Sequence, residues 1–227
     1  MAATYTSGVA STDGDSYTPV DDFLVWALSG YRDGTTTSSS QTHDGDSMTE
    51  LGDVTIDFAG GADPFGWQAY LANPNESSAT LSATFSGTPS AQRGWAMTLG
   101  GVDTADPLDS EDSASYTGSN TPSFTIDAPA NSCIVFWKHH GHSAGAAASW
   151  TTPTGFTERY ANVMITSPAR RELRVYTRDV TTALTSFDLS ADTTGTPVGG
   201  VHGYAIYNEL AAGGAGIEIL RRRIEGY

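Results

Sequence analysis

Thr151-Thr152-Pro153-Thr154-Gly155-Phe156-Thr157-Glu158 is the stretch that decides the fold. Pro153 fixes its own φ and Gly155 permits a positive φ, so the stretch has the composition of a tight turn, and Phe156 can enter a core directly after it. An upstream stretch, residues 44–50, also places a large apolar residue, Met48, before a Thr-Glu pair. We interpret the two stretches as the same turn in two halves of the chain.

The sequence around the two turns matches as well. An apolar run precedes each turn, and an alternating run centred on Tyr70 or Tyr176 follows it. Each half then ends in a short run that begins at Gly94 or at Gly203. The matched positions lie 106 to 109 residues apart. This near-constant offset predicts two weakly similar β half-units, residues 22–109 and 123–210.

Composition favours an all-β fold. The chain has 25 glycines among its 227 residues and 10% aromatic residues, and long helical patterns are absent before the last dozen positions. Short strands bounded by turn residues are typical of antiparallel sandwiches and jelly rolls. We therefore predict one jelly-roll-like antiparallel β-sandwich over residues 22–210, with an N-terminal arm (1–21) that could instead be an edge strand, a polar connector (110–121) and a C-terminal segment (211–227).

Charge and hydropathy limit the partners. With 11 basic and 26 acidic residues the chain carries a formal charge of −15, which argues against a nucleic-acid partner because phosphates need basic contacts. No apolar run approaches the ~20 residues of a membrane span, so no membrane partner is expected. Residues 2–20 are too polar for a signal peptide, which predicts synthesis in a cytoplasm without standard export. The single Cys133 excludes an intrachain disulfide.

Gly45-Asp46-Ser47 resembles the nucleophile block of the Gly-Asp-Ser esterases, with Ser47 as the nucleophile. Those enzymes need an apolar strand before the block and an Asp three residues before the catalytic histidine. Residues 35–44 contain no apolar residue, and no aspartate stands three residues before any histidine that follows the block. We therefore interpret Ser47 as a turn residue and keep the serine esterase as a second alternative.

Metal-binding patterns are present but incomplete. His139, His140 and His142 are the densest histidine cluster, but on a strand only His140 and His142 would share a face. Three acidic groups are candidate calcium ligands, although none has the full spacing of a calcium loop: Asp13 with Asp15, Asp44 with Asp46, and Asp103 with Asp106 and Asp109. We expect no required cofactor and no catalytic or metal-binding residue, with calcium as the one candidate ion.

The tryptophans favour a core over a sugar-stacking surface. Four of the five lie in apolar or alternating runs. Trp150 alone follows a small-residue loop and is the candidate for a glycan contact. A carbohydrate-binding adhesin module is therefore the first alternative function.

Three motifs carry a family resemblance over about residues 22–210: the Thr-Pro-Thr-Gly-Phe-Thr-Glu turn at 152–158, the alternating strand around Tyr176, and Gly-Val-Asp-Thr-Ala-Asp-Pro-Leu-Asp at 101–109. Together they resemble β-sandwich modules of structural proteins in tailed bacteriophages. The first half departs from the pattern, with Asp46-Ser47-Met48 in place of Thr-Gly-Phe. The resemblance implies a non-enzymatic virion protein, such as a capsid decoration, head-fibre or tail component, and supplies no catalytic residues.

The C-terminal segment carries the concentrated basic charge of the chain. Three adjacent arginines follow a glycine-rich hinge and are flanked by large aliphatic residues, which a solvated tail does not need. We predict that this segment docks onto other virion proteins or onto further copies of the chain in a homo-oligomer. The predicted docking residues are Ile217, Ile219, Leu220, Arg221, Arg222, Arg223 and Ile224.

Overall fold

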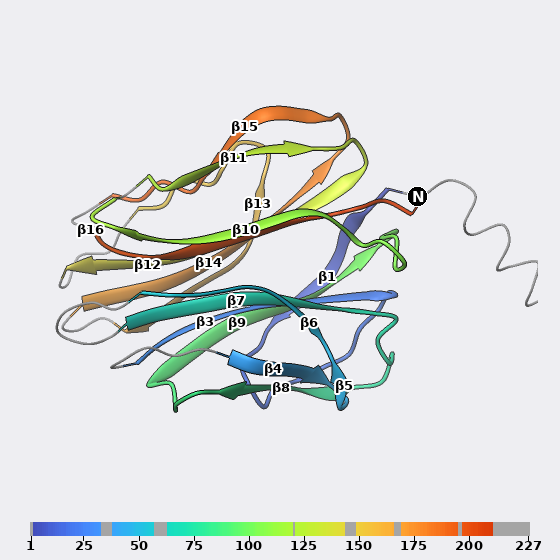
Figure 1. The fold of residues 1–227 in the computed structure, drawn as a ribbon, viewed down its shortest axis with the longest axis horizontal. Helices are drawn as coiled ribbons and strands as arrows, with labels where there is room; N and C mark the ends of the chain where they lie inside the picture. Colours follow the sequence, from blue (N-terminus) through green and yellow to red (C-terminus); the bar gives the residue numbers. More distant parts are fainter. Residues whose placement is uncertain are drawn as a thin grey trace, which may run out of the picture.

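The computed structural model describes residues 2–32, 38–56, 63–119, 121–143, 149–165, 169–194 and 197–210. Within these ranges the chain forms strands β1 to β16 and no helix, so it contains no helix that could cross a membrane. The strands build four antiparallel sheets, which Figure 1 shows stacked as four layers. The predicted all-β antiparallel sandwich class is confirmed, and each half of the chain builds one packed pair of sheets, called here the N-terminal and the C-terminal sandwich.

Two five-stranded sheets form the middle layers. The first has the order β1 (Thr4–Ala10), β9 (Ala91–Gly100), β3 (Phe23–Arg32), β7 (Asp63–Ala72) and β6 (Thr49–Thr55). The second has the order β10 (Leu108–Thr117), β16 (Pro197–Tyr207), β12 (Ser132–Ser143), β14 (Ala169–Val180) and β13 (Thr157–Ile165). Each sheet is made by one half of the chain.

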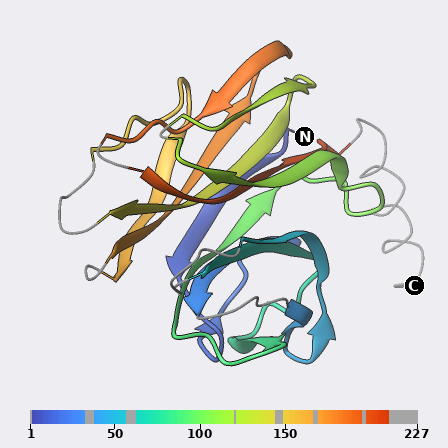
Figure 2. The same cartoon turned by 60° about the vertical axis from the view of Figure 1, so that its left-hand side comes forward.

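A smaller sheet covers the outer face of each middle layer. The N-terminal half adds a four-stranded sheet with the order β2 (Ser16–Tyr17), β8 (Ala79–Phe85), β4 (Ser38–His43) and β5 (Asp46–Ser47). The C-terminal half adds the pair β11 (Ser123–Ala128) and β15 (Leu184–Ser190). Figure 2 shows the two halves from another side, with β1 running along the C-terminal half.

The central strands β3 and β12 of the two middle layers are buried on both faces, which explains their continuous apolar sequences. In β3, Phe23, Val25 and Ala27 face a central core between the two five-stranded sheets, while Leu24 and Trp26 face the outer core of the N-terminal sandwich. The same alternation in β12 divides its side chains between the central core and the outer core of the C-terminal sandwich. The central core therefore joins the halves.

Polar contacts cross the central core as well. Ser29 Oγ and His139 Nδ1 lie 2.6 Å apart, and Gln68 Nε2 donates to the Tyr207 hydroxyl at 2.5 Å. At the edge, Arg93 Nε donates to Asn162 Oδ1 at 3.2 Å. Buried hydrogen bonds need defined partners, so these contacts fix how the sheets are positioned on each other.

Two predicted boundaries were wrong. Residues 1–21 are not an arm, because β1 is the edge strand next to β9 and β2 pairs with β8. Residues 110–121 are not merely a connector, because β10 pairs with β16 along Leu108–Thr117. Both β1 and β10 are edge strands with exposed polar side chains, so they lack the apolar alternation that marks a strand in the sequence.

The two halves share their strand order, but the matched residues do not share their faces. Tyr70 and Tyr176 lie in corresponding strands, β7 and β14, yet Tyr70 packs at the central core and Tyr176 lies in the outer core. A one-residue slip in a strand moves a side chain to the opposite face, and Gly94 and Gly203 show the same slip. Met48 and Phe156 do fill matching places, each in an outer core just before β6 or β13. The duplication and the jelly-roll connections stay predictions.

Candidate functional site

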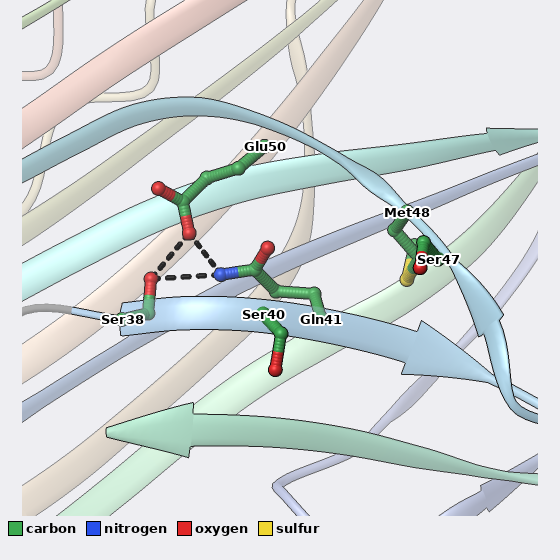
Figure 3. A pocket seen from close by; sticks show the side chains of 6 residues that line it. All are labelled: Ser38, Ser40, Gln41, Ser47, Met48 and Glu50. Carbon is green, nitrogen blue, oxygen red and sulfur yellow. Dashed lines mark hydrogen bonds between the residues drawn. The ribbon is translucent and has the colours of Figure 1, made fainter. Parts of the chain in front are cut away.

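A hollow of about 260 Å³ opens on the N-terminal sandwich where the β4–β5 hairpin passes into β6 (Figure 3). Among the described residues, the lining is polar apart from one methionine. The lining residues are Ser38, Ser40, Gln41, Ser47, Met48 and Glu50.

The turn of the hairpin places Ser47 at the hollow. Asp44 and Gly45 both have positive φ, 55° and 84°, which is the conformation of a two-residue type I′ hairpin turn. The turn pairs Thr42 with Ser47 across the hairpin. Met48 follows, its N–H donates to the Gln41 carbonyl at 2.8 Å, and its side chain enters the outer core. Asp-Gly is the sequence that favours this turn, so the Gly-Asp-Ser block is explained by local structure.

Glu50 is held by two donors. Ser38 Oγ and Gln41 Nε2 both donate to Glu50 Oε2, and Gln41 Nε2 lies 2.7 Å from Ser38 Oγ. Gln41 is only 3% exposed, so its amide is fixed by packing. Figure 3 shows Glu50 Oε1 and Gln41 Oε1 outside this network. Neither oxygen accepts a hydrogen bond from the part of the chain that the structure describes.

A second carboxylate lies behind the network. The Ser38 backbone N–H donates to Asp53 Oδ2 at 3.1 Å. Burial raises the pKa of Asp53 to about 6; the hydrogen bond from Ser38 opposes this rise and the negative charge of Glu50 adds to it. Ser38 therefore donates to both carboxylates, and the charge of Glu50 disfavours the ionisation of Asp53.

Among the described residues, no histidine lies in hydrogen-bond contact with Ser47 at the hollow. His43 faces away from Ser47 on the hairpin, and its Nε2 lies 3.1 Å from the Tyr17 carbonyl oxygen. None of the hydrogen bonds among the described residues joins Ser47 to a histidine. The structure thus places Ser47, the nucleophile of the esterase alternative, in a polar hollow where no described histidine is bonded to it.

A second polar cluster lies in the C-terminal sandwich around Lys138, the single lysine of the chain. Lys138 is fully buried, its Nζ donates to the Ala191 carbonyl at 2.5 Å, and it lies 5.5 Å from the centre of the Tyr116 ring and 5.3 Å from that of Trp150. Burial lowers the pKa of Lys138 to about 7, and the charge of Asp192 partly opposes this. Lys138 directly follows the apolar run 133–137, and this position indicates a buried lysine that the sequence analysis did not identify.

Trp150, the predicted glycan contact, belongs to this cluster. Its indole is half-buried, and Nε1 donates to Glu172 Oε2 at 2.7 Å. The Arg174 guanidinium lies 5.1 Å from its ring centre. The indole therefore already has a polar partner and a stacking partner within the chain, and the glycan contact stays a prediction.

The neighbouring histidines face opposite sides of β12, as the sequence predicts. His139 faces the central core, where Ser29 donates to the Phe65 carbonyl and so accepts from His139 Nδ1. Burial and the charge of Arg171 lower the pKa of His139 to about 3. His140 faces the outer core, with Nε2 3.0 Å from Thr193 Oγ1. The side chain of His142 lies outside the described residues.

The acidic groups proposed as calcium ligands serve turns. Asp15 accepts from the Thr12 N–H at 2.6 Å, Asp44 from Asn75 at 2.8 Å, and Asp103 from the Ala105 N–H at 3.0 Å. Across the ranges that the structure describes, no group of three or more His, Cys, Asp or Glu side chains could hold a metal ion. The predicted docking residues 217–224 lie outside those ranges.

Comparisons of the chain with protein-family models, with curated proteins and with solved structures found no match.

Proposed function

We propose that the chain is a non-enzymatic structural component of a virus particle, as a capsid decoration, head-fibre or tail protein present in several copies. The observation that carries the proposal is the central core, which fastens two sandwiches into one four-layer body. A body of this kind suits a part whose task is to hold its shape between neighbours. The resemblance to phage β-sandwich modules supplies the kind of particle.

The chemistry of the buried groups supports a structural role. Four side chains with the chemistry of nucleophiles or bases are fully buried in contacts between layers: Ser29, His139, His140 and Lys138. Their hydrogen bonds hold sheets and loops together. A nucleophile must reach its substrate, and these side chains lie where packing excludes one.

The experiment is mass spectrometry and cryo-electron microscopy of the particle that the chain would belong to. We expect the chain in many copies and density that fits the four-layer body at a repeated position. Absence of the chain from purified particles would refute the particle role. Hydrolysis of a p-nitrophenyl ester that is lost in Ser47→Ala would refute the non-enzymatic role and favour the esterase.

The docking role of residues 211–227 is tested separately. We expect a chain without these residues to keep the melting temperature of the sandwiches but to lose co-sedimentation with particles that lack the native protein. A matched control replaces Arg221, Arg222 and Arg223 by lysine, which keeps the charge. Co-sedimentation of the truncated chain at the level of the full chain would contradict the docking role.

A further inference from the structure

The hollow beside Ser47 has the features of a binding site that the structural role does not use. We propose that it binds one ring of a neutral saccharide, through the free oxygens of Glu50 and Gln41 and the hydroxyl of Ser47. This inference does not rest on the proposed particle role, and either can fail without the other.

The first argument is preorganisation. The donors Ser38 and Gln41 fix one oxygen of Glu50, and the amide of Gln41 is fixed by burial. The second oxygen of Glu50 and the carbonyl oxygen of Gln41 stay available as acceptors (Figure 3). Groups that are already ordered lose little entropy when a ligand binds, and a charged acceptor makes the stronger kind of hydrogen bond.

The second argument is the kind of ligand that these groups select. The free oxygens of Glu50 and Gln41 require donors, which disfavours phosphates and carboxylates on a chain with a charge of −15. Ser40 and Ser47 add exposed hydroxyls that both donate and accept. A ligand with several hydroxyls matches this mixture, since each of its hydroxyls also donates and accepts.

The third argument disfavours cations. A metal ion needs a shell of oxygen ligands, whereas Glu50 Oε2 is occupied by an N–H and an O–H donor. An organic ammonium only donates hydrogen bonds, so it could not accept one from the hydroxyls of Ser40 and Ser47. A hollow of about 260 Å³ has room for one sugar ring, and Met48 supplies an apolar wall for the C–H face of that ring.

The test uses the full chain and saturation-transfer NMR with a panel of free sugars: D-glucose, D-galactose, D-mannose and N-acetyl-D-glucosamine. Methylammonium and calcium chloride serve as competing probes. We expect ring protons of at least one sugar to receive saturation, with millimolar affinity by titration, and neither cation to compete. Lack of a signal for every sugar, or displacement of a bound sugar by either cation, would overturn the proposal.

Three variants locate the binding. Glu50→Gln removes the charged acceptor while keeping the shape, and should weaken the sugar at least about tenfold. Glu76→Gln removes the same charge from an exposed turn of the same half and should change nothing. Ser47→Phe blocks the mouth without touching the Glu50 network, and so decides the question if Glu50→Gln fails to fold. Equal affinity in wild type and Ser47→Phe would place any sugar elsewhere and refute the site.

Discussion

Replacing Lys138 by methionine should change how stability depends on pH. Lys138 is fully buried, and its pKa is lowered from 10.5 to about 7, first by burial. A lysine whose pKa is lower in the folded protein than in the unfolded chain takes up a proton on unfolding, so stability falls as the pH falls from 10.5 towards 7. Below pH 7 both states are protonated and the loss stays constant.

The size of the effect follows from the two pKa values. A pKa lowered from 10.5 to about 7 corresponds to about 5 kcal/mol between the protonation states. Between pH 9 and pH 7 this single group should cost the wild-type protein about 2 kcal/mol of folding free energy. Lys138→Met removes the donor to the Ala191 carbonyl at every pH. The loss of this hydrogen bond therefore lowers the stability of the variant equally at all pH values and does not change how its stability depends on pH.

The assay is urea unfolding of both proteins at several pH values from 7 to 9. As the pH is lowered from 9 to 7, we expect the free energy of unfolding of the wild type to fall by about 2 kcal/mol more than that of Lys138→Met. Because the chain has one lysine, selective ¹³C labelling of lysine gives one side-chain signal, and that signal should titrate near pH 7. Parallel stability curves, together with a lysine that titrates near its ordinary value, would refute the reasoning.

Three further substitutions test other parts of the structure by thermal or urea unfolding. Asp53→Asn should stabilise the protein by about 1 kcal/mol at pH 8, after allowance for solvent screening at this half-buried site, because the raised pKa penalises the ionised carboxylate. The gain should fade between pH 6 and pH 4; a gain that grows on acidification would contradict the cause. Gly66→Ala should cost about 2 kcal/mol, because a Cβ there would lie 2.5 Å from the buried ring of Trp137, and an unchanged stability would mean that the sheets are not packed this closely. Tyr207→Phe should cost about 1–3 kcal/mol by leaving the buried Gln68 amide without its acceptor, whereas a cost below 0.5 kcal/mol, about the low end for one hydrogen bond, would argue against that bond.

The sequence predicted the parts of the fold that have a strong local pattern. The apolar runs that became β3 and β12, and the turn before Phe156, could be read because burial on both faces leaves no polar position. The sequence could not show which residues of the two halves are equivalent to within one position. Tyr70 and Tyr176 have similar sequence surroundings although they face different cores. The edge strand β10 is rich in Ser, Asp and Glu because one of its sides is solvated, which is the composition of a loop.

The candidate site was only partly predictable. Ser47 stood out through a motif, and the structure explains that motif by an Asp-Gly turn. Glu50, Ser38 and Gln41 come together because β6 returns past β4, and no spacing in the sequence marks side chains that meet in this way. Their role depends on which oxygens stay free after folding, which only the three-dimensional arrangement determines.

The pairing of β10 with β16 has a consequence for synthesis on the ribosome. All strands of the N-terminal sandwich exist once Gly100 has been made, whereas β10 has no partner strand until Pro197–Tyr207 follows. During this interval its backbone groups are free to pair with a strand of another nascent chain. The exposed carboxylates of Asp109, Glu111 and Asp112 oppose such pairing, because two copies of this acidic strand repel each other. We expect the acidity of β10 to oppose pairing between nascent chains until the last strand of the same chain is made.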